Sequence, residues 1–237
     1  MEFSYTGSEL EAMTLARNYY RWIFRSCVPY LGRRVIEVGA GIGTFSSLLL
    51  GVDSIETVIL VEPARNLIPA LQSLQSGTRV TVIHGHLEDV PTTCMADSMV
   101  LINVLEHVED AASFLRVARA RLAPAGRLLV FVPAGPRLFG TLDASFGHHR
   151  RYTQRSLGSS LASAGFTVRL LRYMNVPGVV SWFVAGKILR QRTLAARQVQ
   201  LYDRLVVPWL SKLESRWCPP FGQSLFAVAQ SEDGGTA

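Results

Sequence analysis

The sequence predicts a doubly wound α/β fold with a mostly parallel sheet, and three observations support this. Short, apolar, β-branched segments alternate with helical segments over residues 32–133. The strands are apolar along their whole length, as expected when helices cover both faces of a sheet. Hydrophobic residues make up 49% of the 237 residues and charged residues only 18%, so one large core is expected.

We expect a single domain over residues 1–237, in which residues 1–31 form a helical cap and residues 32–133 the first half of the sheet. The cap helix is expected over Ser8–Cys27 because apolar residues recur there at helical spacing. The strands expected in the first half are Arg34–Val38, Thr57–Val61, Val80–His84, Ser98–Val104 and Arg127–Val132. The helices expected between them are Thr44–Leu50, Ala64–Leu74 with a kink at Pro69, and Ala111–Leu122.

After Pro133 the regular alternation ends, and residues 134–237 form a second half of different character. A glycine-containing loop, residues 134–152, precedes a helix that Thr153 caps. Two further strands, Phe166–Tyr173 and Ser224–Ala229, bring the expected sheet to seven. Between them lies a helical insertion, about residues 176–217, with helices over Pro177–Arg190 and Leu194–Arg216 and a kink at Pro208. Residues 231–237 are expected to be a frayed tail.

Composition and charge indicate which ligands, metals and cellular locations are expected for this protein. The net charge of +6 is read as a solvated arginine-rich surface, with nucleic acid or an anionic membrane as alternatives. Three scattered cysteines predict neither a disulfide framework nor a zinc site, so no metal is expected and a reducing cytoplasm fits. No secretory signal is predicted. The longest apolar run, residues 176–189, is too short to span a bilayer but could lie on its surface.

The first expected strand ends in a glycine-rich turn, Glu37-Val38-Gly39-Ala40-Gly41-Ile42-Gly43. Ligands of open α/β sheets bind at this edge, where glycines let the ligand approach the backbone and leave amide N–H groups bare. A dinucleotide turn has the spacing G-x-G-x-x-G, but Thr44 stands at the third glycine position here. Glu37 adds an acid before the turn, which suits a ligand with a cationic group and no pyrophosphate.

S-adenosylmethionine is such a ligand, and residues 35–133 resemble the class I S-adenosylmethionine-dependent methyltransferases. Four segments carry the resemblance in the family's order: VIEVGAGIG, VILVEP, HGHLED and DSMVLINVLEHVED. The resemblance implies that the first segment contacts the methionine part of the cofactor and that Glu62, in the second, binds the ribose hydroxyls. In the third segment it implies that Glu88 binds the adenine amine and that Leu87 stacks on the adenine. The fourth segment would line the far side of the cofactor. The implied cofactor residues are Glu37, Gly39, Ala40, Gly41, Glu62, Pro63, Leu87, Glu88, Asn103, Leu105 and, from the cap helix, Tyr20.

LEHVED, followed by a loop with paired histidines, is most similar to ubiquinone-biosynthesis-type and related small-molecule O-methyltransferases. The resemblance implies methyl transfer to an oxygen of a small, hydrophobic or amphiphilic molecule, with S-adenosylhomocysteine as product. A nitrogen or carbon acceptor, or a catalytically silent binding subunit, remains an alternative. The glycine spacing argues against an NAD-dependent oxidoreductase. No nucleic acid is expected, since no NPPY-type or paired-cysteine catalytic motif is present.

Catalysis is expected in the loop that follows the fifth strand and carries HHRRY. His149 is the first choice for a general base, with His148 and then His107 as alternatives. Arg150, Arg151 and Tyr152 are expected to bind the acceptor, and Trp182 of the insertion is expected to cover it. A solvated basic patch is the competing interpretation for the loop. Core packing, a homodimer contact and docking on a membrane surface are the alternatives for the insertion.

Overall fold

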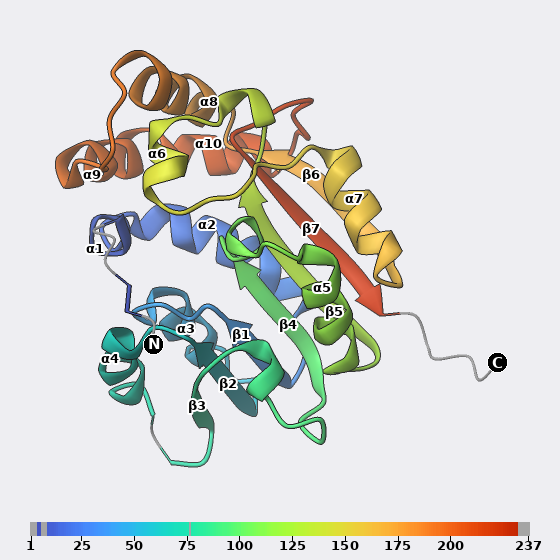
Figure 1. Ribbon diagram of the computed structural model, residues 1–237. Coiled ribbons are helices and arrows are strands. Elements are labelled where there is room, and N and C mark those ends of the chain that lie inside the picture. The colour runs from blue at the N-terminus through green and yellow to red at the C-terminus, as the bar shows by residue number, and fades with distance from the viewer. Residues whose placement is uncertain (1–3, 6–8, 76, 232–237) are drawn as a thin grey trace.

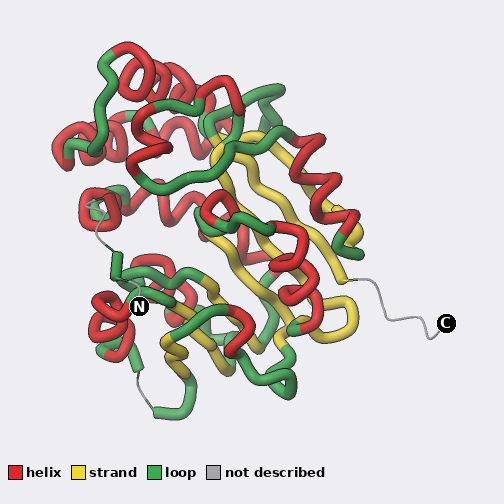
Figure 2. Tube along the Cα trace, viewed as in Figure 1, coloured by secondary structure: helices red, strands yellow, loops and turns green. Residues whose placement is uncertain are grey.

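The computed structural model describes residues 4–5, 9–75 and 77–231, and within them seven strands form one sheet in the order β3-β2-β1-β4-β5-β7-β6 (Figures 1 and 2). Strands β1 to β5 are parallel, and β7 is antiparallel to both β5 and β6. This confirms the predicted mostly parallel, doubly wound fold. The strands are β1 Arg34–Val38, β2 Thr57–Glu62, β3 Val80–His84, β4 Ala96–Ile102, β5 Leu122–Pro133, β6 Phe166–Met174 and β7 Ser224–Ser231.

The core has two layers because alternate strand residues point to opposite faces of the sheet. Ile36 and Val130 pack with α5 (Ala111–Ala120) and α7 (Gln154–Ser163) on one face. Val35 and Leu129 belong to the other layer, which contains residues of α2 (Arg17–Cys27), α3 (Thr44–Leu50) and α4 (Ile68–Gln72). Both faces are covered, which explains why the strands are apolar along their whole length.

Two helix predictions were wrong in part, one in its interior and one at its start. The cap helix is broken into α1 (Glu9–Met13) and α2, because the chain leaves helical geometry at Ala16. The helix after β2 begins at Ile68 rather than Ala64, after a 3₁₀ turn over Arg65–Leu67. Pro69 does not kink it but lies in its first turn, where the missing N–H breaks no hydrogen bond.

Two strand predictions need correction at their ends. Strand β4 runs from Ala96 to Ile102 and stops before Asn103, whose φ of 54° is incompatible with a strand. Strand β5 starts at Leu122 because that residue pairs with Ala96 across a register shift.

The loop at the start of the second half is more helical than predicted. The loop 134–152 contains a 3₁₀ turn over Pro136–Leu138 and a short helix, α6 (Thr141–Ser145). The first insertion helix, α8 (Val176–Phe183), continues as a π-helical turn over Val184–Ile188. The second is divided into α9 (Ala196–Leu205) and α10 (Val207–Glu214) next to Pro208, as the proline suggested.

The insertion lies beyond the carboxyl ends of β4 and β5, at the top of Figure 1. None of the helices that the structure describes combines the length and the apolar character required to cross a bilayer. The expected frayed tail after residue 231, and residues 1–3 and 6–8 of the expected cap, lie outside the described residues.

Candidate active site

The glycine turn adopts left-handed backbone geometry, with φ of 70° at Gly39, 59° at Gly41 and 82° at Gly43. A Cβ atom at Gly39 would lie 2.7 Å from Val104 Cγ2, so this glycine is needed for close packing of the turns that follow β1 and β4. A Cβ at Gly41 would meet Leu10 of α1 at 3.7 Å, an ordinary contact, but the positive φ still disfavours a side chain.

The expectation of bare amide groups in this turn was wrong. The N–H groups of Gly39 and Ala40 both donate to the carbonyl of Val61, at 2.8 and 3.1 Å. The N–H of Gly41 donates to Glu62 Oε2 at 2.8 Å, and Ala64 N–H donates to Glu62 Oε1 at 2.9 Å. Glu62 therefore links the β1 turn to the β2 turn.

Glu37 is the residue here whose surroundings fit a cationic ligand. Its side chain is buried at the end of β1, and Oε2 has no hydrogen-bond partner. Removal from water, reinforced by the negative charge of Glu62, raises its pKa to about 8. An ammonium group at this position would supply the missing partner and favour the charged carboxylate.

The other implied cofactor residues divide into an exposed and a buried group. Asn103 and Glu88 are exposed, and Pro63 is half-buried. Leu87 and Leu105 lie in the core and are at most 1% exposed, so neither side chain presents a face for stacking or lining. Tyr20 is half-buried, and burial first and then the charges of Tyr19 and Glu37 raise its pKa. Its phenol therefore lies near Glu37, as a cap residue over this edge should.

The loop after β5 is organised by Asp143 of α6, a residue that the sequence interpretation missed. Asp143 is fully buried, and its Oδ1 accepts from Arg151 Nε at 2.7 Å and lies 3.0 Å from His148 Nδ1. Its Oδ2 accepts from Trp182 Nε1 at 3.1 Å and from Gly140 N–H at 3.0 Å. Burial alone would raise the pKa of Asp143, but these donors and the charge of Arg151 hold it below its usual value.

Two of the residues expected to bind the acceptor make other contacts instead. Arg151 is 4% exposed, donates from Nη1 to the carbonyl of Ala134 and stacks on the Trp182 ring at 4.7 Å. Tyr152 is buried and donates its hydroxyl to the carbonyl of Leu105 at 3.1 Å. Tyr152 thus holds the loop against the chain that follows β4, and Arg151 holds it to α6 and α8. Both contacts are structural, which corrects the prediction. Arg150 is half-buried and donates to the carbonyl of Glu109.

The three histidines proposed as bases differ in their surroundings. His148 has a side chain only 9% exposed, with Nδ1 on Asp143 and Nε2 4.0 Å from Glu106 Oε1. The His107 ring packs edge-on against that of His148, with centroids 4.8 Å apart. Partial desolvation and then the His148 charge lower the pKa of His107 to about 4. His149 is exposed, and its backbone N–H donates to the carbonyl of Glu106.

Glu106 is the second buried acid, after Asp143, in the side-chain cluster that also contains His107, His148 and Arg151. Neither of its oxygens has a hydrogen-bond partner, and burial raises its pKa to about 8 despite the nearby Arg151. Ligand atoms of Glu106, His107 and His148 lie within 4.8 Å of one another, a spacing that could hold a metal ion. The sequence named His107 and His148 as candidate bases but predicted no metal site here, because His148 lies far along the chain from the adjacent Glu106 and His107 and no cysteine is present.

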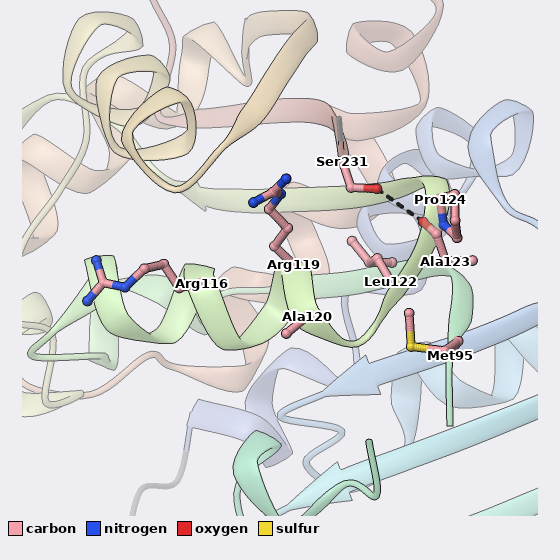
Figure 3. A pocket seen from close by; sticks show the side chains of 8 residues that line it. All are labelled: Met95, Arg116, Arg119, Ala120, Leu122, Ala123, Pro124 and Ser231. Atoms are coloured by element: carbon pink, nitrogen blue, oxygen red, sulfur yellow. Dashed lines mark hydrogen bonds between the residues drawn. The ribbon is translucent and has the colours of Figure 1, made fainter. Parts of the chain in front are cut away.

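A separate pocket of about 250 Å³ lies where β4 and β5 begin, at the opposite end of these strands from the cluster (Figure 3). Arg116 and Arg119 of α5 line it, and Ser231 donates to the carbonyl of Ala123 at its rim. It contains none of the implied cofactor residues, so the candidate site is the carboxyl edge of β1, β2, β4 and β5.

The strand order, the acid before the glycine turn and the acid that ends β2 together define a class I S-adenosylmethionine-dependent methyltransferase. A family described as "Methyltransferase domain" matches residues 17–171, most of the chain, and the protein belongs to that family. The chain therefore contains a methyltransferase domain, of the class that uses S-adenosylmethionine.

Relatives and solved structures support the same class. A ubiquinone biosynthesis O-methyltransferase of Xylella fastidiosa is 33% identical over 105 residues, 44% of this chain and 43% of that protein. One of Marinobacter nauticus is 27% identical over 177 residues, 68% of this chain and 74% of that protein. The Xylella match thus covers less than half of that relative.

Among solved structures, a methyltransferase of Archaeoglobus fulgidus has a TM-score of 0.60 at 17% identity, covering 91% of this chain and 94% of its own. The N-methyltransferase NodS of Bradyrhizobium japonicum, solved with S-adenosyl-L-homocysteine, has a TM-score of 0.59 at 14% identity, covering 92% of this chain and 87% of its own. At these identities the likeness shows the fold alone.

Proposed function

We propose that the enzyme methylates an oxygen, a hydroxyl or carboxylate, of a small hydrophobic or amphiphilic molecule, and that His148 is the general base for a hydroxyl acceptor. A carboxylate acceptor is already ionised and needs no base. The observation that supports the proposal is the buried Asp143–His148 pair in the loop after β5. The Xylella and Marinobacter relatives are named O-methyltransferases, which favours oxygen over nitrogen or carbon.

The cofactor supplies a methyl group already activated by the sulfonium charge. The residues of the first half then have a binding and orienting task. Glu37 is placed to pair with the ammonium, and Glu62 to accept from the ribose hydroxyls once it releases an amide of the turns. Correct orientation of donor and acceptor contributes up to about 7–11 kcal/mol to catalysis in reactions of this type.

His148 has the geometry of an oriented base. When Nδ1–H donates to Asp143, Nε2 carries the free lone pair and can accept a proton from the acceptor hydroxyl. Asp143 fixes this tautomer and stabilises the ring once it is charged. His149 has no such partner among the contacts that the structure describes, so the geometry favours the second choice made from sequence over the first.

The base assignment is tested by His148→Ala beside the neighbouring His149→Ala. We expect His148→Ala to lower turnover by about 10²–10⁴ and leave affinity for S-adenosylmethionine unchanged, with little effect of His149→Ala. The reverse pattern would move the role to His149. Turnover that is lost on chelation and restored by a divalent cation would assign Glu106, His107 and His148 to a metal ion instead.

The acceptor class is tested by a homologous series of phenols and carboxylic acids with increasing alkyl chain length. Each buried methylene is worth about 0.8 kcal/mol, so affinity should rise roughly fourfold per methylene. Formation of S-adenosylhomocysteine is the measurement. A small, fully polar acceptor preferred over every member of the series would contradict the proposed acceptor class while leaving the methyltransferase assignment intact.

A further inference from the structure

Exposed apolar side chains are concentrated in one part of the molecule. Among the described residues, twelve large apolar side chains are exposed, and eleven of them lie between residues 180 and 221. Their exposure is high on the last two insertion helices, from 59% at Leu201 to 76% at Trp209. Large apolar residues gathered in this way, rather than scattered singly, mark a surface that contacts something other than water.

Helix α9 shows why these residues remain outside. Its inner side carries Asp203, which is buried and accepts from the backbone N–H groups of Asn18 and Tyr19 at the start of α2. Leu201 and Leu205 lie four residues apart and so share one face, while Asp203, midway between them, points the opposite way. Their 59% and 63% exposure is therefore fixed by the anchoring of the helix.

Helix α10 repeats this arrangement. Val207 and Leu210 are buried in the core, and the buried Glu214 accepts from the backbone N–H groups of Asn175 and Val176. Trp209 and Leu213 again lie four residues apart on the outer side, and both are exposed. Each helix thus has a polar anchor among the residues on its inner side and an apolar row on its outer side, where a helix on a globular protein usually carries polar residues.

The charges of the insertion identify the kind of surface that it fits. Residues 176–217 contain two acids, Asp203 and Glu214, and both are buried in the contacts just described. The seven basic residues are all exposed: Lys187, Arg190, Arg192, Arg197, Arg204, Lys212 and Arg216. The outer surface of the insertion therefore combines apolar side chains with positive charge alone.

We propose that this surface, residues 180–221 with their exposed apolar and basic side chains, docks the enzyme on an anionic lipid membrane. The apolar rows of α9 and α10 enter the headgroup region, and the surrounding lysines and arginines pair with lipid phosphates. A second copy of the chain fits less well, because face-to-face pairing would bring two sets of seven cations together.

The docked surface is connected directly to the candidate active site. Thr141 Oγ1 of α6 donates to the carbonyls of Gly186 and Gln191, and Trp182 of α8 donates to Asp143. Asp143 in turn holds His148. Docking would therefore hold the acceptor side of the cleft near the lipid, while the first half of the sheet extends away from it.

The test is co-sedimentation of the full chain with vesicles of phosphatidylcholine, alone or mixed with phosphatidylglycerol. We expect binding only to the mixed vesicles, weakened by salt. The double variant Leu205→Ser/Trp209→Ser should bind at least roughly tenfold more weakly. Arg197→Gln/Arg204→Gln should lose roughly fivefold per residue. These side chains are exposed, so folding and S-adenosylmethionine affinity should be retained.

Matched controls come from outside the insertion. Val28→Ser removes the one exposed large apolar residue that the described part of the chain has elsewhere, and Arg127→Gln removes an exposed cation of β5. Neither should change vesicle binding. Absence of binding to mixed vesicles would overturn the proposal, as would equal binding to both vesicle types. Lipid-free self-association that Leu205→Ser/Trp209→Ser abolishes would assign the surface to a second copy and overturn it as well.

Discussion

The two halves of this enzyme are built on different principles. In the half that contains residues 32–133, the site is made of backbone turns at strand ends, and its polar side chains come from β1 and β2. In the half that follows β5, the site is made of side chains that contact one another through one buried acid, Asp143. A site made by strand ends is specified by local sequence, whereas a site made by side-chain contacts is specified by tertiary packing.

The largest difference between the halves should appear on removal of Asp143. Asp143→Ala leaves the buried Arg151 without its carboxylate partner, which should lower the free energy of unfolding by about 3–5 kcal/mol. The matched control is Glu56→Ala, which breaks the exposed pair with Arg33 and should cost about 0–1 kcal/mol. Urea denaturation of both variants measures the difference. Equal small losses would show that the loop is not held by Asp143.

This contrast explains what the sequence could predict. Strand β1, helix α3 and strand β3 were predicted to the residue, because an apolar run bounded by glycine, proline or a polar turn defines each one. Glu37 and Glu62 could be placed at the edge because they occupy fixed positions relative to those strands.

The features of the site that could not be predicted depend on contacts between residues far apart in the chain. Asp143 is an isolated acid in a loop, and its partner Trp182 lies 39 residues away. Arg151 and Tyr152 look like exposed ligands in HHRRY, yet packing buries both. The one available signal was an acid in an otherwise apolar and basic segment, LDASFGHHRRY, which a buried cation would require.

The next largest effect should be on the cofactor side. Glu62→Ala removes the carboxylate that joins the two turns, and each hydrogen bond to a charged group is worth about 1.5–3 kcal/mol. We expect at least roughly tenfold weaker binding of S-adenosylmethionine by calorimetry. Gly41→Val should weaken it too, because its φ of 59° disfavours a side chain. Unchanged affinity in both variants would contradict the location of the cofactor site.

The free energy of unfolding should depend on pH through the titration of Glu37. Its pKa rises from 4.5 to about 8 on folding, so the folded protein holds this proton more tightly than the unfolded chain. The contribution of Glu37 to stability is therefore complete below about pH 4.5 and falls as pH rises through 8, by about 1.4 kcal/mol for each pH unit between these values. Glu37→Gln should remove this part of the pH dependence of the free energy of unfolding. A variant that keeps the full wild-type slope would show that Glu37 does not titrate in this range.

The same proton should control cofactor binding in the opposite direction. A cationic ammonium needs the ionised carboxylate, so affinity for S-adenosylmethionine should rise with pH and level off above about 8. The rise should approach roughly tenfold per pH unit well below that value. Glu37→Gln should bind weakly and with a flatter profile. Calorimetry across the range measures both proteins, and parallel profiles would remove Glu37 from the ammonium site.

The smallest expected effect separates two roles of Trp182. Trp182→Phe keeps an aromatic ring against Arg151 but removes the N–H that donates to Asp143 at 3.1 Å. Loss of one bond to a charged carboxylate should cost about 1.5 kcal/mol of stability, the low end for such bonds, because Arg151, His148 and Gly140 still contact Asp143. Trp209→Phe is the matched control, because that ring is 76% exposed and its replacement should leave stability unchanged.

If Trp182 also covers the acceptor, Trp182→Ala should flatten the dependence of turnover on acceptor chain length, while Trp182→Phe should preserve it. A loss of stability in Trp182→Phe together with an unchanged chain-length dependence in Trp182→Ala would assign this residue to the Asp143 network alone.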